Sequence, residues 1–161
     1  MSNVGDVTRE AAEGRVHEFA TSSGADTIEV GRKLAQLLKP PQLLLLRGDL
    51  GTGKTTLVKG IAEALDAAEA DEVTSPTFTL IHEYDGAREG RPVKLFHLDV
   101  YRLEGERQLE TLGLDELLTS DALVLVEWGE KFKSIRKKAT GEIAISSVVG
   151  DARKITVTLK E

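Results

Sequence analysis

The sequence contains no cysteine among its 161 residues, so disulfide bonds and thiolate-bound metal ions are excluded. Its apolar runs stop well short of the roughly 20 residues that a helix needs to cross a bilayer. The first 14 residues are polar and lack the apolar centre of a secretory signal peptide. From these absences we expect a cytoplasmic chain with no membrane segment.

Basic residues are in the minority, because 21 Lys and Arg stand against 27 Asp and Glu and the formal net charge is -6. Affinity for phosphate backbones comes largely from Lys and Arg, so any contact with RNA is expected to run through a partner. The length suits one domain with a substantial core. We expect residues 1–14 to form a flexible tail and residues 15–161 to form a single domain.

A phosphate-binding loop is the most informative feature that is present. Residues 48–55 read G-x-x-x-x-G-K-T, after the apolar run 43–46 and before helical spacing over 56–62. The glycines let backbone N–H groups and the positive end of the helix dipole surround a β-phosphate. Lys54 is expected to reach the β- and γ-phosphate oxygens, and the Thr55 hydroxyl to complete a Mg²⁺ shell. The residues expected to bind the nucleotide here are Gly48, Asp49, Leu50, Gly51, Thr52, Gly53, Lys54, Thr55 and Thr56.

Buried apolar strands alternate with helical segments along the chain, which predicts an α/β fold. Helices are expected over 26–38 behind a serine cap, directly after the phosphate-binding loop, and over 106–118. A hairpin turn over 85–92 and a late pair of strands over 142–149 and 154–159 make part of the sheet antiparallel. The predicted architecture is a P-loop NTPase-like mixed sheet with helices on both faces.

Two acidic residues stand at the ends of apolar strands, where phosphoryl chemistry sits in this class of fold. Asp99 ends the strand over 93–98, and Glu127 ends the strand over 123–126. Such a carboxylate can hold Mg²⁺ directly, hold a metal-bound water, or orient the attacking water. Lys54, Asp99 and Glu127 are therefore the expected catalytic residues.

Several nearby side chains leave two interpretations open. Thr77 and Thr79 lie where related switches sense the γ-phosphate and Mg²⁺, but a turn around Pro76 explains them equally well. Trp128, the single tryptophan, fits a contact with the nucleotide or a partner as well as ordinary packing. Arg102 could stabilise transition-state charge, although a surface ion pair is the more frequent case for such an arginine.

Two further features are expected to be structural. His97 lies within an apolar strand, which favours a packed or hydrogen-bonded imidazole. The basic run 131–138 is typical of a solvated face, and contact with RNA or an acidic partner is the less frequent alternative.

Four strings of the sequence together resemble the TsaE family, the small bacterial ATPases needed for threonylcarbamoyladenosine (t6A) modification of tRNA. The strings are GDLGTGKTT over 48–56, SPTFTL over 75–80, FHLDVYRL over 96–103 and LVEW over 125–128. They occur in an order and spacing that run through nearly the whole chain, from about residue 19 to residue 160. A P-loop alone is common, but the four strings in this order are specific.

The resemblance implies ATP and Mg²⁺ as cofactors, weak intrinsic hydrolysis, and assembly with the TsaB and TsaD subunits, with tRNA met through that complex. By the same resemblance Thr55 and Glu127 hold Mg²⁺, Asp99 is functionally required as part of the metal site, and Trp128 lies beside the nucleotide. It also places the adenine near residues that match only loosely, namely Ser22, Ser23 and Gly150. Thr52 stands where the family commonly has alanine.

Three enzymatic roles are open to a chain with such a loop. An ATPase that works as a switch for a partner agrees with a P-loop and two strand-end carboxylates. The alternative, a small-molecule P-loop kinase, usually needs an arginine-bearing lid and a substrate pocket, for which the short chain leaves little room. A GTPase normally uses an Asn-Lys-x-Asp string for guanine, and the only asparagine is Asn3.

Overall fold

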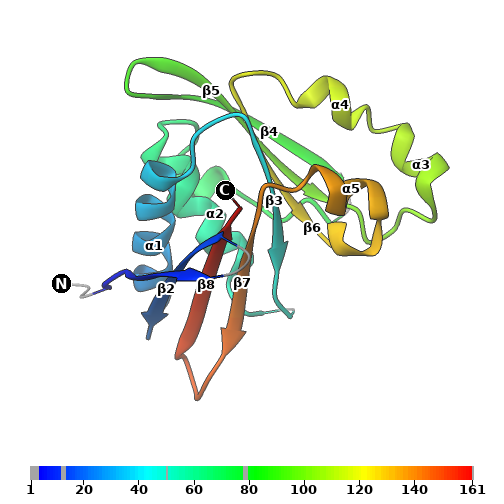
Figure 1. Ribbon diagram of the computed structural model, residues 1–161. Coiled ribbons are helices and arrows are strands. Elements are labelled where there is room, and N and C mark those ends of the chain that lie inside the picture. Colours follow the sequence, from blue (N-terminus) through cyan, green and yellow to red (C-terminus); the bar gives the residue numbers. More distant parts are fainter. Residues whose placement is uncertain (1–3, 12–13, 50, 78–79, 161) are drawn as a thin grey trace.

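The computed structural model describes residues 4–11, 14–49, 51–77 and 80–160. Their strands form one eight-stranded sheet in the order β1-β2-β8-β7-β3-β6-β5-β4 (Figure 1). No helix in the described part of the chain is both long and apolar enough to cross a membrane. The strands are β1 (Val7–Ala11), β2 (Gly14–Thr21), β3 (Gln42–Arg47), β4 (Ile81–Arg88), β5 (Arg91–Asp99), β6 (Ala122–Glu127), β7 (Gly141–Ser147) and β8 (Arg153–Leu159). The helices are α1 (Gly24–Leu37), α2 (Lys54–Ala64), α3 (Glu106–Glu110), α4 (Leu114–Leu117) and α5 (Lys133–Lys138), with short 3₁₀ turns η1 (Ala70–Glu72) and η2 (Gly129–Lys131).

The sheet is mixed, as the sequence predicted. Strand β3 runs parallel to both β6 and β7, and β5 runs parallel to β6. The pairs β4–β5, β7–β8, β2–β8 and β1–β2 are antiparallel. The parallel centre matters for function, because the carboxyl ends of β3, β5 and β6 meet at one edge of the sheet.

Helices cover both faces of the sheet, which confirms the predicted architecture (Figure 1). On one face α1 and α2 contribute Val30, Leu34, Leu57 and Ile61 to a core that includes inward residues of the central strands. The other face is covered by α3, α4 and α5, which supply a second core cluster containing Leu109, Leu114 and Ile135. The phosphate-binding loop lies at the start of α2, so the first of these faces carries the candidate site.

The predicted tail is partly a strand. Residues 7–11 form β1, which pairs with β2 so that Val7 lies opposite Glu18 and Ala11 lies opposite Gly14. The imidazole of His17 anchors the segment, with its Nδ1 2.7 Å from Asp6 Oδ2 and 3.1 Å from Thr8 Oγ1. Backbone pairing at a sheet edge needs little apolar character, which is why the polar composition of this segment did not predict a strand.

Two other boundaries differ from the sequence prediction. The helix expected over 106–118 is two short helices, α3 and α4, because Gly113 between them adopts a positive φ of 67°. The hairpin turn expected over 85–92 is tighter, since β4 runs to Arg88 and the turn is Glu89-Gly90. Neither difference moves the end of β5 that carries Asp99.

Helices α1 and α2 approach closely because glycines face each other at their contact. A Cβ atom added to Gly60 would overlap the carbonyl oxygen of Ile28, and one added to Gly31 would overlap that of Leu57. Both obstacles are backbone atoms, so no side-chain rotation relieves the overlap. The glycine pair therefore fixes the distance between α1 and the helix that begins at the phosphate-binding loop.

We expect Gly60→Val to lower the free energy of unfolding by about 3 kcal/mol, because the helices must separate to admit the side chain. Urea denaturation followed by circular dichroism measures this change. Gly24→Val is the matched control, since a Cβ at Gly24 meets no atom within 4 Å. Equal stability of the two variants would show that the α1–α2 contact tolerates expansion.

Candidate functional site

The loop between β3 and α2 has the backbone of an anion cradle. Gly51 and Gly53 adopt positive φ values of 82° and 109°, which side chains other than glycine rarely accept. At Gly48 an added Cβ would lie 2.7 Å from Thr52 Oγ1 and 2.8 Å from Ile145 O, so the loop also needs glycine for space. Helix α2 begins at Lys54 directly after the loop. Its first N–H groups therefore face the hollow that the loop encloses.

Lys54 lies inside this hollow rather than in bulk solvent. Its ammonium donates to the Gly48 carbonyl and lies 3.2 Å from Glu127 Oε1. Only 12% of the Lys54 side chain is exposed. A cation held at the start of a helix, beside inward-facing N–H groups, provides a strong site for phosphate oxygens.

The parallel pairing of β5 and β6 brings the two strand-end carboxylates together. Asp99 and Glu127 are partners in the register, and each residue is only 5% exposed. The Tyr101 backbone N–H donates to Asp99 Oδ1 at 2.9 Å, which fixes the orientation of that carboxylate. The structure thus places both predicted acids at the same edge as Lys54.

Glu127 is held on both of its oxygens. Its Oε2 lies 2.7 Å from Nε2 of the buried His97, while its Oε1 faces Lys54. Burial raises the pKa of the Glu127 carboxyl, but its contacts with His97 and Lys54 outweigh burial and hold that pKa below its usual range. Glu127 is therefore an ionised carboxylate at neutral pH. The expectation that His97 is hydrogen-bonded is confirmed.

These groups share one cavity of about 510 Å³. The cavity has a cationic end at Lys54, an acidic wall at Asp99 and Glu127, and an aromatic rim. Thr77 also lines it, and its hydroxyl is 2.7 Å from that of Ser75. The full set of lining residues is Gly51, Gly53, Lys54, Thr55, Thr56, Ser75, Thr77, Asp99, Tyr101, Glu127 and Trp128.

The aromatic rim is formed by Tyr101, two residues after Asp99, and Trp128, directly after Glu127. The rings of Tyr101 and Trp128 lie 4.9 Å apart and are tilted by 54°. Both are exposed, and Trp128 adopts a positive φ of 67°, which is strained for a bulky residue. Lys131 donates to the carbonyls of Tyr101 and Leu103 at 2.7 and 3.0 Å, so it supports the rim from behind.

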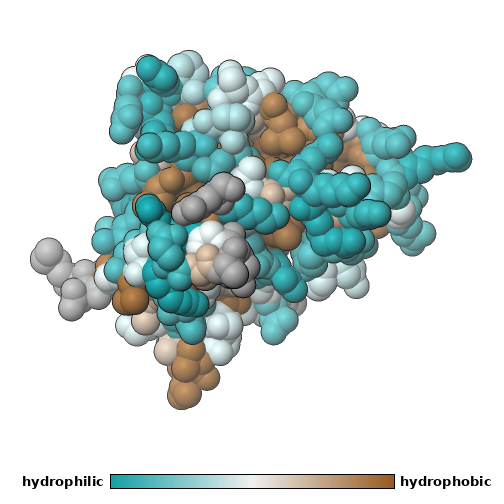
Figure 2. All heavy atoms as spheres, in the orientation of Figure 1, coloured by the Kyte–Doolittle hydropathy of each residue, from teal (hydrophilic) through white to brown (hydrophobic). Residues whose placement is uncertain are grey.

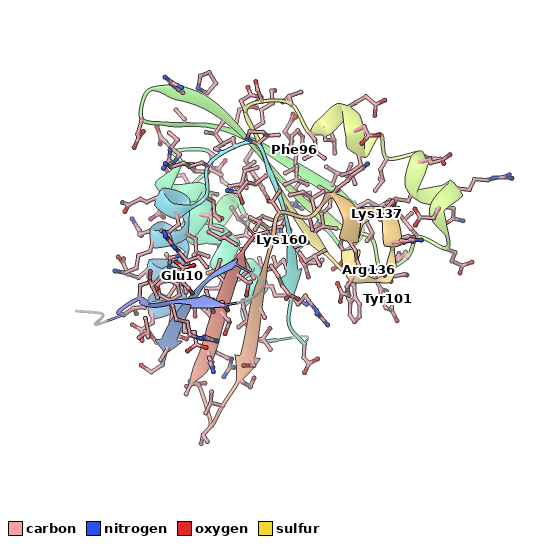
Figure 3. The ribbon with its side chains drawn as sticks, viewed as in Figure 1. Glu10, Phe96, Tyr101, Arg136, Lys137 and Lys160 are labelled. Atoms are coloured by element: carbon pink, nitrogen blue, oxygen red, sulfur yellow. The ribbon has the colours of Figure 1, made fainter. Side chains whose placement is uncertain are left out.

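The basic run lies close to this rim. Figure 3 shows Tyr101 at the end of the molecule that also carries α5 and Arg136. Lys138 pairs with Asp115 at 2.9 Å, and Arg136 donates to the Glu130 carbonyl. The run is thus partly engaged in contacts within the protein.

A second, smaller cavity of about 360 Å³ opens on the other side of the glycine loop. Ser23 borders it, and its hydroxyl also caps α1 by accepting from Asp26 N at 3.1 Å. Arg153 lines it too and donates to the carbonyls of Thr52 and Gly150 at 3.3 and 2.8 Å. The arginine therefore ties the β7–β8 hairpin to the phosphate-binding loop.

Arg153 was missed by sequence reasoning, because it belongs to no motif and its loop partner is 101 positions away. The tip of the same hairpin is apolar and exposed, since Val148 is 62% exposed and Val149 is 79% exposed (Figure 2).

Some predicted residues are not among those lining the main cavity. Gly48 and Asp49 line a neighbouring hollow on the β7 side of the loop, and Thr52 lines the smaller cavity with Ser23. Arg102 is exposed and is not among the lining residues of either cavity. Gly150 takes part only through its carbonyl, which Arg153 holds. Leu50 and Thr79 lie outside the described residues.

The mixed sheet, with a glycine loop between β3 and the start of α2, defines an α/β protein of the P-loop NTPase-like class. A family model described as threonylcarbamoyl adenosine biosynthesis protein TsaE matches residues 21–155. The chain therefore belongs to the TsaE family.

Relatives named tRNA threonylcarbamoyladenosine biosynthesis protein TsaE agree with this assignment. The Bacillus subtilis (strain 168) protein is 39% identical over 142 residues, covering 88% of this chain and 84% of its own. The Streptomyces coelicolor protein is 40% identical over 135 residues, covering 81% of this chain and 88% of its own. The crystal structure of Bacillus subtilis YdiB superposes with a TM-score of 0.64 at 31% identity, covering 96% of this chain and 88% of that one.

Proposed function

We propose that the protein is the ATP-binding and ATP-hydrolysing component of the machinery that forms N6-threonylcarbamoyladenosine at position 37 of tRNA. It would act in the cytoplasm together with TsaB and TsaD, and meet tRNA through that complex. The names of its relatives support the pathway. The observation that carries the chemistry is the convergence of Lys54, Asp99 and Glu127 on one cavity at the start of α2.

Binding is assigned to the loop and to α2. The N–H groups at the start of α2 and the Lys54 ammonium would neutralise the β- and γ-phosphates. To do so Lys54 would exchange its contacts with the Gly48 carbonyl and Glu127 for phosphate oxygens, and its ammonium already lies in the cavity. The adenine would extend toward the smaller cavity bordered by Ser23 and Arg153, or along the rim at Trp128.

Oxygen donors suited to Mg²⁺ line the same cavity: the Thr55 hydroxyl and the carboxylates of Asp99 and Glu127. Bound there, Mg²⁺ would offset negative charge on the transferring phosphoryl group. One Asp99 oxygen accepts from the Tyr101 N–H, whereas both Glu127 oxygens have partners within the protein. We therefore assign Asp99 and Thr55 to metal contacts, and Glu127 to a contact made directly or through water.

The reaction itself needs a positioned water in line with the γ-phosphate. Glu127 is an ionised acceptor at the cavity wall, so it can orient that water and receive its proton. Lys54 remains on the phosphate oxygens, where negative charge redistributes. We expect hydrolysis by these few groups alone to be slow. A partner that completes the site would accelerate hydrolysis, and this dependence on the partner is the basis of the switch role.

The test is ATP turnover by the purified protein with Mg²⁺, measured alone and with TsaB–TsaD, beside t6A formation on tRNA. We expect slow hydrolysis alone, faster hydrolysis with TsaB–TsaD, and repeated t6A synthesis only when all three proteins and ATP are present. GTP in place of ATP should support neither activity. Phosphorylation of a nucleoside or small alcohol at catalytic rates would instead favour a kinase.

Trp128 gives an optical test of the nucleotide site. It is the only tryptophan, it lines the cavity and it is 41% exposed, so its emission reports events at the rim. We expect ATP to cause a saturable change in tryptophan fluorescence. Trp128→Ala should weaken ATP binding by about tenfold, as expected for loss of one aromatic contact with a base. Unchanged emission at an ATP concentration that saturates calorimetric binding would remove Trp128 from the site.

A further inference from the structure

His97 is a fully buried polar side chain at the wall of the candidate site. It lies on β5 two residues before Asp99, and successive strand residues alternate between faces, so both side chains point to the face covered by α2. In the β5–β6 register His97 pairs with Leu125, which is two residues before Glu127. The imidazole therefore approaches Glu127 diagonally from beneath the cavity.

The geometry shows a carboxylate fixed from two sides. Nε2 of His97 is 2.7 Å from Glu127 Oε2, and Nζ of Lys54 is 3.2 Å from Glu127 Oε1. Lys54 must turn toward phosphate when a nucleotide binds, so its hold on Glu127 weakens at the moment the reaction needs it. The contact with His97 comes from the core and stays in place.

The second ring nitrogen identifies the tautomer. Nδ1 of His97 is buried and has no hydrogen-bond partner among the described residues. A proton on Nδ1 would be a buried donor left unsatisfied, which is costly. A proton on Nε2 instead points at the Glu127 carboxyl oxygen 2.7 Å away, which accepts it in a hydrogen bond. The geometry therefore makes Nε2 the nitrogen that donates to Glu127.

We propose that His97 is a positioning residue, whose Nε2–H holds the Glu127 carboxylate in the orientation that hydrolysis requires. The proposal rests on the function proposed above and adds a role for a residue that does not line the cavity. Burying an imidazole among apolar residues costs free energy unless the imidazole is hydrogen-bonded. Here the hydrogen bond to Glu127 offsets that cost and also orients the carboxylate.

Two amide substitutions separate positioning from packing. A Gln side chain places its amide nitrogen as many bonds from Cα as Nε2 of histidine, whereas the Asn nitrogen is one bond shorter. His97→Gln can thus still donate to Glu127, and His97→Asn cannot reach it. We expect His97→Asn to lower kcat for ATP hydrolysis by about 10- to 100-fold, as for other groups that orient an active-site ligand. His97→Gln should keep kcat close to wild type.

The effect should fall on kcat and not on KM, because Lys54 and the loop bind ATP without His97. ATP affinity measured by calorimetry should accordingly be the same in both variants and the wild type. Equal kcat for the Gln and Asn variants, or a loss confined to KM, would overturn the positioning role. His82→Gln is the control on the neighbouring strand, since His82 pairs with His97 in register but does not line the cavity.

A spectroscopic measurement keeps the proposal testable if the variants fold poorly. Long-range ¹H–¹⁵N correlation spectra of the wild-type protein at neutral pH assign the His97 tautomer. We expect the proton to be on Nε2. We also expect the chemical shift of Nε2 to change in Glu127→Gln, where a neutral amide replaces the carboxylate. A proton on Nδ1 would contradict the proposal. Absence of ATP turnover in the wild type would instead count against the proposed function and leave the tautomer result standing.

Discussion

Lys54→Ala is expected to weaken ATP binding by about 100-fold, the upper end for loss of one charge-assisted contact. Turnover at saturating ATP should fall by about 10²–10³, because the same ammonium faces the phosphate oxygens on which negative charge redistributes. The structure gives the reason, since Lys54 is a nearly buried cation at the start of α2 with the cavity in front of it. Calorimetric titration and a phosphate-release assay measure the two effects.

The matched control is Lys59→Ala, which removes the same charge from the same helix outside the cavity. It should bind and hydrolyse ATP like the wild type. Lys54→Ala also leaves Glu127 without its ammonium partner, so thermal denaturation of both variants is needed to separate lost binding from lost folding. Wild-type affinity in a folded Lys54→Ala protein would remove the phosphate role from Lys54.

Glu127→Gln is expected to reduce ATP turnover by about 100-fold or more while ATP affinity changes far less. The substitution keeps the shape of the side chain but removes the charge that orients and deprotonates water. The pKa of Glu127 is held below its usual range, so the wild-type group is fully ionised at neutral pH and the variant removes a complete charge. Single-turnover hydrolysis with and without TsaB–TsaD gives the rate of the chemical step.

Glu83→Gln on β4 is the control for a carboxylate on the same sheet. Glu83 is exposed, and it is not among the residues that line the cavity. Its turnover should match the wild type. If Glu127→Gln hydrolysed ATP as fast as Glu83→Gln in the presence of TsaB–TsaD, the assignment of Glu127 to the chemical step would be wrong.

Local sequence signals predicted the parts of the site that depend on neighbouring residues. The glycine loop, the start of α2 and the serine cap of α1 are each set within a few positions along the chain, and the structure has all three. The strand ends at Asp99 and Glu127 were also predictable, because each closes a largely apolar strand. Because the carboxyl ends of parallel strands meet at the same edge of a sheet, the two acids are then expected to lie close together.

Contacts between distant segments could not be predicted in this way. Arg153 reaches the Thr52 carbonyl only because β8 is placed by pairing with β2 and β7. The bond between His97 and Glu127 depends on the exact register of β5 against β6, which a pattern of apolar residues leaves undetermined. Strand β1 escaped prediction because an edge strand is held by its backbone and needs no apolar face.

The central claim is that nucleotide at Lys54 controls how this protein works with TsaB and TsaD. The most direct measurement is capture of purified TsaB–TsaD on the immobilised protein, with and without ATP and Mg²⁺, for wild type and Lys54→Ala. We expect capture by the wild type to change with ATP, and capture by Lys54→Ala to be the same under both conditions. A complex that forms equally with both proteins, whether or not ATP is present, would contradict the account.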